Sequence, residues 1–267
     1  MAILTVSLLR VGCRRLALAQ VRTKASVAAT KPVKNLLVGQ RATASLATPV
    51  QPQQQYQSDL VVVLDMDECL LHSHFFTPQA AKLAHQVAPS TKEWNSTSNP
   101  NADEDDATVD TFYLTLADGD VVLVHQRPHL LQFLEHVTSR YETHIFTAAM
   151  SVYAKPVLDR LDPFQQLAGR WYRESCLFQN NAYVKDLNIL QKPNLDRVVL
   201  VDNNPLSFMA NPENGILVQS FYEDASDNTL LAVLDLLHEL EHEPDVKPVL
   251  ERKFGLKVAL KDVNGGI

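Results

Sequence analysis

The stretch DLVVVLDMDE, at residues 59–68, decides the fold of this chain. Between its first two aspartates lie only β-branched and apolar residues, which predicts a short strand buried on both faces of a sheet. The strand ends at Asp65, and a further acid, Asp67, follows one residue later. Ligands of three-layer α/β domains lie beyond the carboxyl ends of the strands, so both acids stand where chemistry is expected.

Further strand and helix signals alternate along the rest of the chain. The segments 111–116 (TFYLTL) and 121–126 (VVLVHQ) predict a small hairpin, because the turn residues ADGD separate them. Helices are predicted over 129–137 and 151–161, and a strand, YETHIF, is predicted between them at 141–146.

Two later elements complete this pattern. RVVLVD at 197–202 is a further apolar strand that ends in an acid, and Ser226 is predicted to cap a long helix with apolar residues recurring between 230 and 240. Alternation of this kind predicts a Rossmann-like, three-layer α/β domain with a central, largely parallel sheet. We expect a small hairpin insertion and no large cap domain.

Composition sets limits on the class of protein. With 267 residues, 46% of them hydrophobic, the chain is long enough for one packed domain with extended ends. All 31 acidic residues but only 16 of the 24 basic ones follow position 58, so this part has a formal charge of −15, which argues against nucleic-acid binding. Three cysteines without a CxxC pair predict neither a disulfide framework nor a zinc site.

The ends and the interior loop have compositions of their own. Residues 1–58 contain no acid and are rich in Ala, Ser, Thr and Arg, which predicts a mitochondrial transit peptide and linker. The alternative is a basic tail on a nuclear or nuclear-envelope-associated protein. The apolar run 1–9 is too short to span a bilayer, and no transmembrane segment is predicted. The expected domain covers 59–250 with a flexible polar insertion at 77–110, followed by a C-terminal tail at 251–267.

Polar groups follow three of the predicted strands directly: Asp65, Thr147 and Asp202. Because the carboxyl ends of neighbouring parallel strands meet at one edge of a sheet, we expect these side chains to cluster, with Lys185 adding a positive charge. A carboxylate can attack phosphorus, and a hard cation such as Mg²⁺ is held by carboxylates, a carbonyl and waters. The cluster therefore predicts phosphoryl transfer in which positioning and charge neutralisation carry most of the rate.

The chain contains the segments LDMDECLLHS, HQRPHLLQFLEHV, HIFTAAMSVYAKPVLDRLD, YRESCLF, AYVKDL, VLVDNNP and SFYEDASDNTLLAVLDLL. In these segments it resembles the FCP1/SCP-type phosphatases of the haloacid dehalogenase superfamily, whose mark is DxDx(T/V). The resemblance runs from about residue 59 to about residue 250, and the tail DVKPVLERKF is similar to that of nuclear-envelope (Dullard-type) members. It implies a Mg²⁺-dependent protein serine/threonine phosphatase acting on phosphoserine or phosphothreonine proteins.

By position, the resemblance implies four catalytic residues. Asp65 would be the nucleophile and a metal ligand. Asp67 would protonate the leaving oxygen and then activate water, and its backbone carbonyl would bind the metal. Thr147 and Lys185 would hold the phosphoryl oxygens.

The resemblance also implies residues that bind without reacting. Ala148 and Arg173 would contact the substrate phosphate, and Asp202 and Asn203 would complete the Mg²⁺ site. Cys69 departs from the family pattern, which has Thr or Val at this point beneath the nucleophile loop. A buried cysteine behaves as a small hydrophobe, so we expect activity to survive.

Two other functions compete with a protein phosphatase. The mitochondrial import receptor Tim50 has a similar domain and uses it as a binding module, and the basic arm favours that compartment. A small-molecule phosphatase would require a cap over its substrate. Three histidines, His72, His74 and His125, show no ligand spacing along the chain and are interpreted as structural or exposed.

Overall fold

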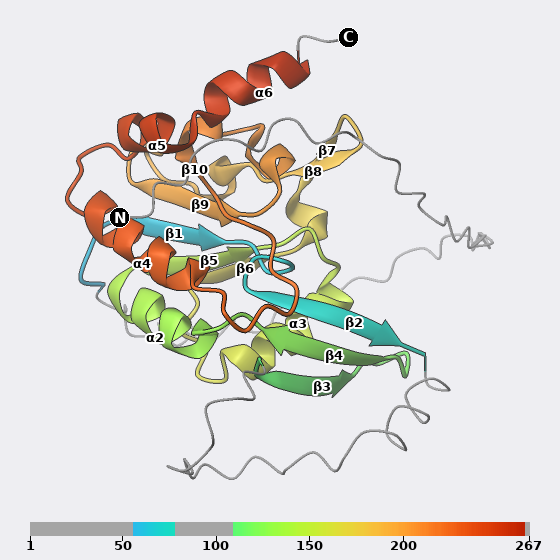
Figure 1. The fold of residues 1–267 in the computed structure, drawn as a ribbon. Coiled ribbons are helices and arrows are strands. Elements are labelled where there is room, and N and C mark those ends of the chain that lie inside the picture. The colour runs from blue at the N-terminus through green and yellow to red at the C-terminus, as the bar shows by residue number, and fades with distance from the viewer. Residues whose placement is uncertain (1–55, 78–108, 265–267) are drawn as a thin grey trace, which may run out of the picture. The chain divides into compact units, whose positions relative to one another are not determined.

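The computed structural model describes residues 56–77 and 109–264 (Figure 1). Nearly all of the predicted transit peptide and linker, and of the predicted insertion at 77–110, lies outside these ranges. A sheet of five parallel strands forms the centre, as the sequence predicts. In spatial order its strands are β10 (Gly215–Leu217), β9 (Val198–Asp202), β1 (Val61–Leu64), β5 (Glu142–Phe146) and β6 (Gly169–Trp171).

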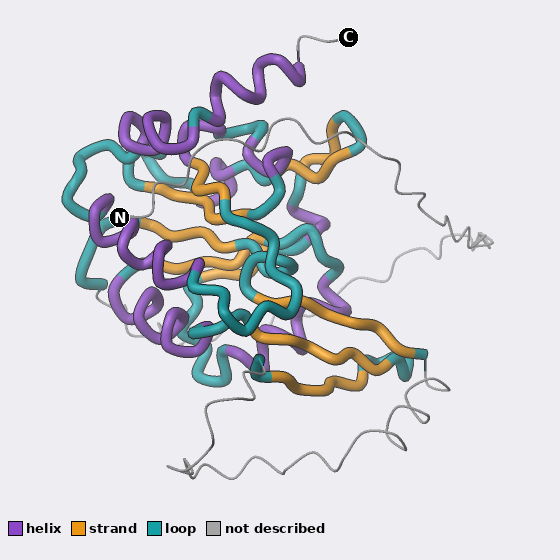
Figure 2. Tube along the Cα trace, in the orientation of Figure 1, coloured by secondary structure: helices purple, strands orange, loops and turns teal. Residues whose placement is uncertain are grey.

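Helices lie on both sides of this sheet, and Figure 2 shows them around the strands. The predicted helix 151–161 is confirmed, and the predicted helix 129–137 runs three residues further. The helices are α2 (Leu130–Arg140), α3 (Ser151–Leu161), α4 (Thr229–Leu240), α5 (Lys247–Phe254) and α6 (Leu256–Asn264). Short 3-10 turns lie between them at η1 (Arg173–Ser175), η2 (Leu187–Leu190), η3 (Pro205–Phe208) and η4 (Pro212–Asn214).

Strand β1 is buried on both faces because apolar side chains fill each of them. Val62 and Leu64 belong to the larger apolar cluster, which side chains of α2, α3, α4 and α5 complete. Val61 and Val63 belong to a second cluster, closed by α6 and the 3-10 turns. Burying a side chain of this size contributes about 1.5–3 kcal/mol, so the two clusters hold β1 firmly between two layers.

The predicted cap of the long helix is wrong. Helix α4 begins at Thr229, whose backbone N–H donates to Oδ1 of Asp227 at 2.9 Å. Ser226 lies further upstream and instead bonds Asp224 through both its N–H and its hydroxyl. Asp is as good a partner as Ser for the free N–H groups at a helix start, so the sequence pattern alone did not distinguish them.

A small antiparallel sheet forms the insertion between β1 and α2. The predicted hairpin is confirmed, and a third strand that the sequence pattern did not indicate joins it. The spatial order is β2 (Leu71–Phe76), β4 (Val121–Gln126) and β3 (Thr111–Thr115). The described residues of this insertion form no large cap domain. Across the described ranges as a whole, no helix is both long and apolar enough to cross a membrane.

Candidate active site

The turn after β1 brings two carboxylates to the carboxyl edge of the central sheet. Met66 is fully buried, and its carbonyl accepts hydrogen bonds from the N–H groups of Leu70 and Leu71 at 2.9 and 3.2 Å. Glu68 adopts a left-handed conformation with φ of 55°, which lets the chain reverse directly after Asp67. The turn therefore holds Asp67 close to Asp65.

Lys185 holds two strand-end carboxylates together. Its Nζ donates to Oδ1 of Asp65 and to Oδ2 of Asp202, at 2.5 Å each, and all three side chains are buried. Burial and the charge of Asp202 raise the pKa of Asp65, whereas Lys185 lowers it. Burial by itself lowers the pKa of Lys185, but the two carboxylates outweigh it and raise that pKa, so the ammonium group stays charged.

The donor groups of this cluster fit a divalent cation. With both aspartates ionised, one ammonium group faces two carboxylates, so the buried cluster lacks positive charge. Oxygen ligands of this kind are those that Mg²⁺ prefers. Asn203, the residue after Asp202, has its side-chain amide fixed by a hydrogen bond from Nδ2 to Oγ of Ser220 at 3.0 Å.

Asp67 is paired with a tyrosine from a distant helix. The hydroxyl of Tyr153 lies 2.6 Å from Oδ1 of Asp67 and 2.6 Å from Oγ of Ser73, so it donates to the carboxylate and accepts from the serine. Burial raises the pKa of Asp67 to about 6, while the hydrogen bond from Tyr153 opposes this shift. A carboxyl group with this pKa can both give and take a proton near neutral pH.

The end of β5 supplies polar groups on the neighbouring strand. Thr147 is buried, and its Oγ1 accepts the N–H of Ala149 at 3.0 Å. Arg173 donates through Nε to the carbonyl of Ala148 at 2.6 Å and lies over the ring of Tyr183 at 4.9 Å. The charge of Arg173 lowers the pKa of Asp67, so the two side chains lie within electrostatic reach of one another.

The structure therefore gathers the sequence-predicted residues at one edge of the sheet. Asp65, Lys185 and Asp202 are in direct contact, Asp67 and Arg173 act on one another electrostatically, and Asn203 follows Asp202 in the chain. Their chemical roles remain predictions.

Sequence reasoning missed Arg127, a buried arginine that contacts the turn after Asp67. Arg127 makes a two-pronged ion pair with Asp227, Nε to Oδ1 at 2.8 Å and Nη2 to Oδ2 at 2.7 Å. It also donates to the carbonyl oxygens of Cys69, at 2.8 Å, and Gln219, at 3.0 Å. Arg127 thus ties the turn after Asp67 to the loop 218–228. Only its position in the motif HQRPHLL could have drawn notice to it.

Cys69 lies where the resemblance puts a small side chain. It is fully buried, and its Sγ lies 3.8 Å from the carbonyl oxygen of Val201 in the adjacent strand. Burial raises the pKa of the Cys69 thiol well above its usual value. The thiol therefore stays neutral and serves as packing beneath the turn.

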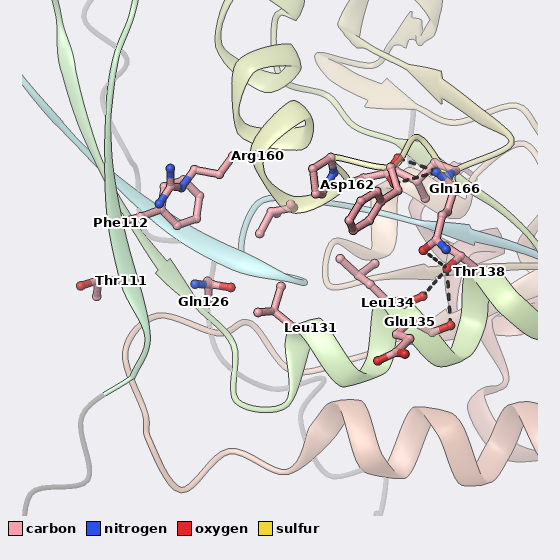
Figure 3. Close-up of a pocket in the computed structure, with 14 residues that line it drawn as sticks. Thr111, Phe112, Gln126, Leu131, Leu134, Glu135, Thr138, Arg160, Asp162 and Gln166 are labelled. Carbon is pink, nitrogen blue, oxygen red and sulfur yellow. Dashed lines mark hydrogen bonds between the residues drawn. The ribbon is translucent and has the colours of Figure 1, made fainter. Parts of the chain in front are cut away.

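A cavity of about 780 Å³ lies away from these residues (Figure 3). It is lined by parts of β3, α2, the end of α3 and the loop that follows, including Leu131, Leu134, Arg160 and Asp162. None of the predicted site residues lines it.

The described domain has the three-layer α/β architecture that the sequence predicts, with helices on both sides of a central parallel sheet. Residues 60–247 match the family described as NLI interacting factor-like phosphatase, and the chain belongs to this family. A solved structure titled "The Structure of Fcp1, an essential RNA polymerase II CTD phosphatase" also matches, with a TM-score of 0.43 and 21% identity, over 70% of this chain and 51% of that one.

Two curated relatives share about a third of the aligned residues. CTD nuclear envelope phosphatase 1B of Danio rerio is 35% identical over 197 residues, which are 73% of this chain and 72% of that protein. CTD small phosphatase-like protein of Homo sapiens is 35% identical over 191 residues, which are 72% of this chain and 59% of that protein.

These comparisons confirm the predicted FCP1/SCP-type family and its activity as a protein phosphatase. They give no support to the Tim50-like binding module over the enzyme. They also give none to a mitochondrial location, since one of these relatives is named for the nuclear envelope.

Proposed function

We propose that this chain removes phosphate from phosphoserine and phosphothreonine residues of other proteins, through an aspartyl-phosphate formed on Asp65 and with Mg²⁺ as cofactor. The observation that carries the proposal is the buried bridge that Lys185 makes between Asp65 and Asp202. It holds a carboxylate in one orientation at the sheet edge, and a second aspartate with a pKa of about 6 lies beside it.

In the first step, a carboxylate oxygen of Asp65 attacks the phosphorus atom of the substrate. The new O–P bond forms as the bond between phosphorus and the seryl or threonyl oxygen breaks. The protonated carboxyl group of Asp67 gives its proton to that oxygen, which leaves as a hydroxyl group. Tyr153 holds the Asp67 carboxyl group in the orientation that this transfer needs.

In the second step, the ionised Asp67 takes a proton from a water molecule whose oxygen attacks the same phosphorus. The bond between phosphorus and Asp65 breaks, inorganic phosphate forms, and the carboxylate of Asp65 is restored. The proton remains on Asp67 for the next cycle, so one group serves as acid and then as base.

The binding residues neutralise the phosphate throughout. Lys185, the Thr147 hydroxyl and the Ala148 N–H are proposed to hold its oxygens, and Arg173 to meet it from the open side. The bound Mg²⁺, held by Asp65, the Asp67 carbonyl, Asp202 and Asn203, would supply positive charge against those oxygens.

The described part of the insertion favours a protein substrate. Small-substrate enzymes close a cap over the reaction, and the described part of the insertion forms only a small sheet. The exposed Phe75 of that sheet packs against Tyr153, with ring centroids 4.9 Å apart. An extended peptide that approaches Asp67 would therefore find the apolar ring of Phe75 beside its path.

The decisive experiment is an Asp65→Asn variant of the full chain, assayed with Mg²⁺ on phosphoserine peptides and on an aryl phosphate. Turnover should fall by more than about a thousandfold, since the nucleophile is gone, while circular dichroism shows a folded protein. Asp118→Asn, on the exposed hairpin turn, is the matched control and should keep full activity. An Asp65→Asn protein that still turns over would exclude the mechanism.

The covalent step can be tested separately with Asp67→Asn and an aryl phosphate, whose leaving group needs no proton. Asp65 should become phosphorylated and stay so, because the base for hydrolysis is missing. Mass spectrometry would detect one added phosphoryl group at Asp65. Its appearance on another residue would contradict the assignment of the nucleophile.

Two locations follow from two different observations. The acid-free residues 1–58 favour import into mitochondria, and the name of the Danio rerio relative favours the nuclear envelope. A fluorescent reporter fused behind residues 1–58 distinguishes them. Uptake of the reporter into mitochondria with cleavage of residues 1–58 would establish the mitochondrial location. A reporter on the full chain that is retained at the nuclear envelope would establish the nuclear one.

A further inference from the structure

The small sheet carries three histidines on one face. His72 and His74 are two residues apart on β2, so their side chains project from the same side of the strand. His125 of β4 stands directly opposite His72 in the register of the two strands. The ring centroids of His72 and His74 are 4.7 Å apart, and those of His74 and His125 are 5.3 Å apart.

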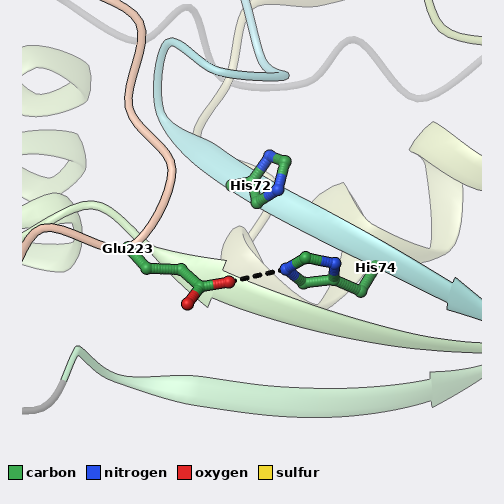
Figure 4. Close-up of side chains that lie close together, drawn as sticks. All are labelled: His72, His74 and Glu223. Carbon is green, nitrogen blue, oxygen red and sulfur yellow. Dashed lines mark hydrogen bonds and ion pairs between the residues drawn. The ribbon is translucent and has the colours of Figure 1, made fainter.

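An acidic residue from a distant loop meets this group (Figure 4). Oε1 of Glu223 lies 2.6 Å from Nε2 of His74 and 3.8 Å from Nε2 of His125. The spacing of these residues along the chain does not indicate the grouping, because two strands and the loop 218–228 build it.

The positions of the side chains suit a metal ion. One ligand atom from each of His72, His74 and Glu223 lies within 4.8 Å of the other two. A tetrahedral Zn²⁺ with bonds of about 2.0–2.2 Å needs its ligand atoms roughly 3.3 Å apart. Small side-chain rotations on a partly exposed surface would close the difference.

His125 provides an independent sign of a missing ligand. Both of its ring nitrogens are buried and have no hydrogen-bond partner within the described ranges. Buried polar nitrogens are nearly always satisfied, and an ion is one of the groups that can satisfy them.

We propose that His72, His74 and Glu223 bind a transition-metal ion of the Zn²⁺ type. Imidazole nitrogens suit Zn²⁺ and its neighbours in the first transition row, whereas Mg²⁺ prefers oxygen. The site is therefore chemically distinct from the carboxylate cluster around Asp65.

A carboxylate next to His72 orients its imidazole ring for metal binding. Nδ1 of His72 lies 3.3 Å from Oε1 of Glu68, which fixes the ring as carboxylates do for many metal-bound histidines. Glu68 follows Asp67 directly in the turn after β1, which we call the nucleophile turn. An ion at this site would thus be connected to the turn through one hydrogen bond.

Binding of the ion would also fasten the loop 218–228. This loop already contacts the nucleophile turn, because the N–H of Phe221 donates to the carbonyl of Glu68 at 2.8 Å. Arg127 holds the same loop at Gln219 and Asp227. Glu223 lies between these two attachments and is half exposed, so a metal bond to it would join the loop to β2.

The test is a calorimetric titration of the metal-free full chain with Zn²⁺, in excess Mg²⁺ to occupy oxygen ligands. The chain should bind one Zn²⁺ that His72→Ala/His74→Ala loses and that Glu223→Gln weakens by at least about tenfold. Co²⁺ in the same site should give the intense visible absorption of tetrahedral coordination, and this too should vanish in the double variant. Glu223→Gln lies on an exposed loop, so it tests the site even if the double variant misfolds.

Two controls separate this site from others. His136→Ala/His238→Ala removes another close histidine pair, with Nε2 atoms 3.0 Å apart, and should leave the affinity unchanged. Asp65→Asn should also retain it, because the carboxylate cluster is separate. Zn²⁺ affinity that is unaltered by both Glu223→Gln and His72→Ala/His74→Ala, or a chain that binds no Zn²⁺, would overturn the proposal.

Discussion

Tyr153 donates a hydrogen bond of 2.6 Å to Asp67, although one residue lies on α3 and the other in the turn after β1. This contact stabilises the ionised carboxylate, while burial favours the protonated acid. The two effects together leave the pKa of Asp67 at about 6, where the group can change its charge during each cycle.

Replacing Tyr153 by Phe should raise the pKa of Asp67 further. A hydrogen bond to the charged form is lost, which is worth about 0.5–1 pH unit. Asp67 must be protonated in the first step, so activity falls as pH rises through its pKa. The alkaline limb of the kcat/KM profile should therefore move to higher pH. Tyr222→Phe, an exposed tyrosine without this contact, should leave the profile unchanged; a shift toward lower pH in Tyr153→Phe would contradict the assignment.

Asp67→Asn should stabilise the fold above pH 6 even though it abolishes turnover. The pKa of Asp67 is raised from 3.8 in the unfolded chain to about 6 in the fold, so the folded state binds more protons between these values. Stability is therefore lost as pH rises through this window, and the full penalty applies above it. Urea unfolding without divalent metal should show a gain of about 1–3 kcal/mol near pH 8 and little gain near pH 4. An equal gain at both pH values would show that ionisation is not the cause.

Lys185→Met should destabilise the protein strongly, because it leaves Asp65 and Asp202 buried without their shared cation. Removing one partner of a buried ion pair costs about 3–5 kcal/mol, to be measured by urea unfolding at pH 7. Adding Asp202→Asn to Lys185→Met should recover part of the loss, since one uncompensated charge is then removed. Strictly additive losses in the double variant would show that the two residues do not act as a unit.

Arg127→Leu should reduce both stability and activity. Asp227 and the carbonyl oxygens of Cys69 and Gln219 lose their donor, at a cost of about 2–4 kcal/mol. A looser nucleophile turn should lower kcat/KM by about 10- to 100-fold in a phosphopeptide assay. The control is Arg170→Leu, which loses ion pairs to Asp159 and Asp162 and should lose stability alone. Arg127 would be merely structural if both variants kept the parent kcat/KM.

Local sequence patterns predicted the central strands, because each strand is determined by a short run of residues. Runs of apolar residues marked β1, β5 and β9, and because all three run parallel side by side, Asp65, Thr147 and Asp202 could be expected at one edge. Lys185 follows a short hairpin strand outside the central sheet, so the strand-end pattern does not place it. It was expected in the cluster as a positive charge among the carboxylates, and the family motif gave it a role.

Contacts between distant segments could not be read in this way. Tyr153 contacts Asp67 only because α3 packs beside the turn after β1. In the sequence, a tyrosine on the buried face of a helix indicates a core residue rather than a site residue. Arg127 and Asp227 pair across a hundred residues of chain. His72 and His125 come together through the strand register, which depends on a strand, β2, that the sequence pattern did not reveal.

The central place of β1 also has a consequence for biosynthesis. Val61 pairs with Glu142 on one side and with Val198 on the other, so the strand emerges from the ribosome long before either neighbour exists. Such distant pairing makes folding slow and leaves an apolar strand exposed in the growing chain. A polypeptide that stops before β9 would lack both Asp202 and half the partners of β1, and is expected to aggregate rather than to persist as a partly active fragment.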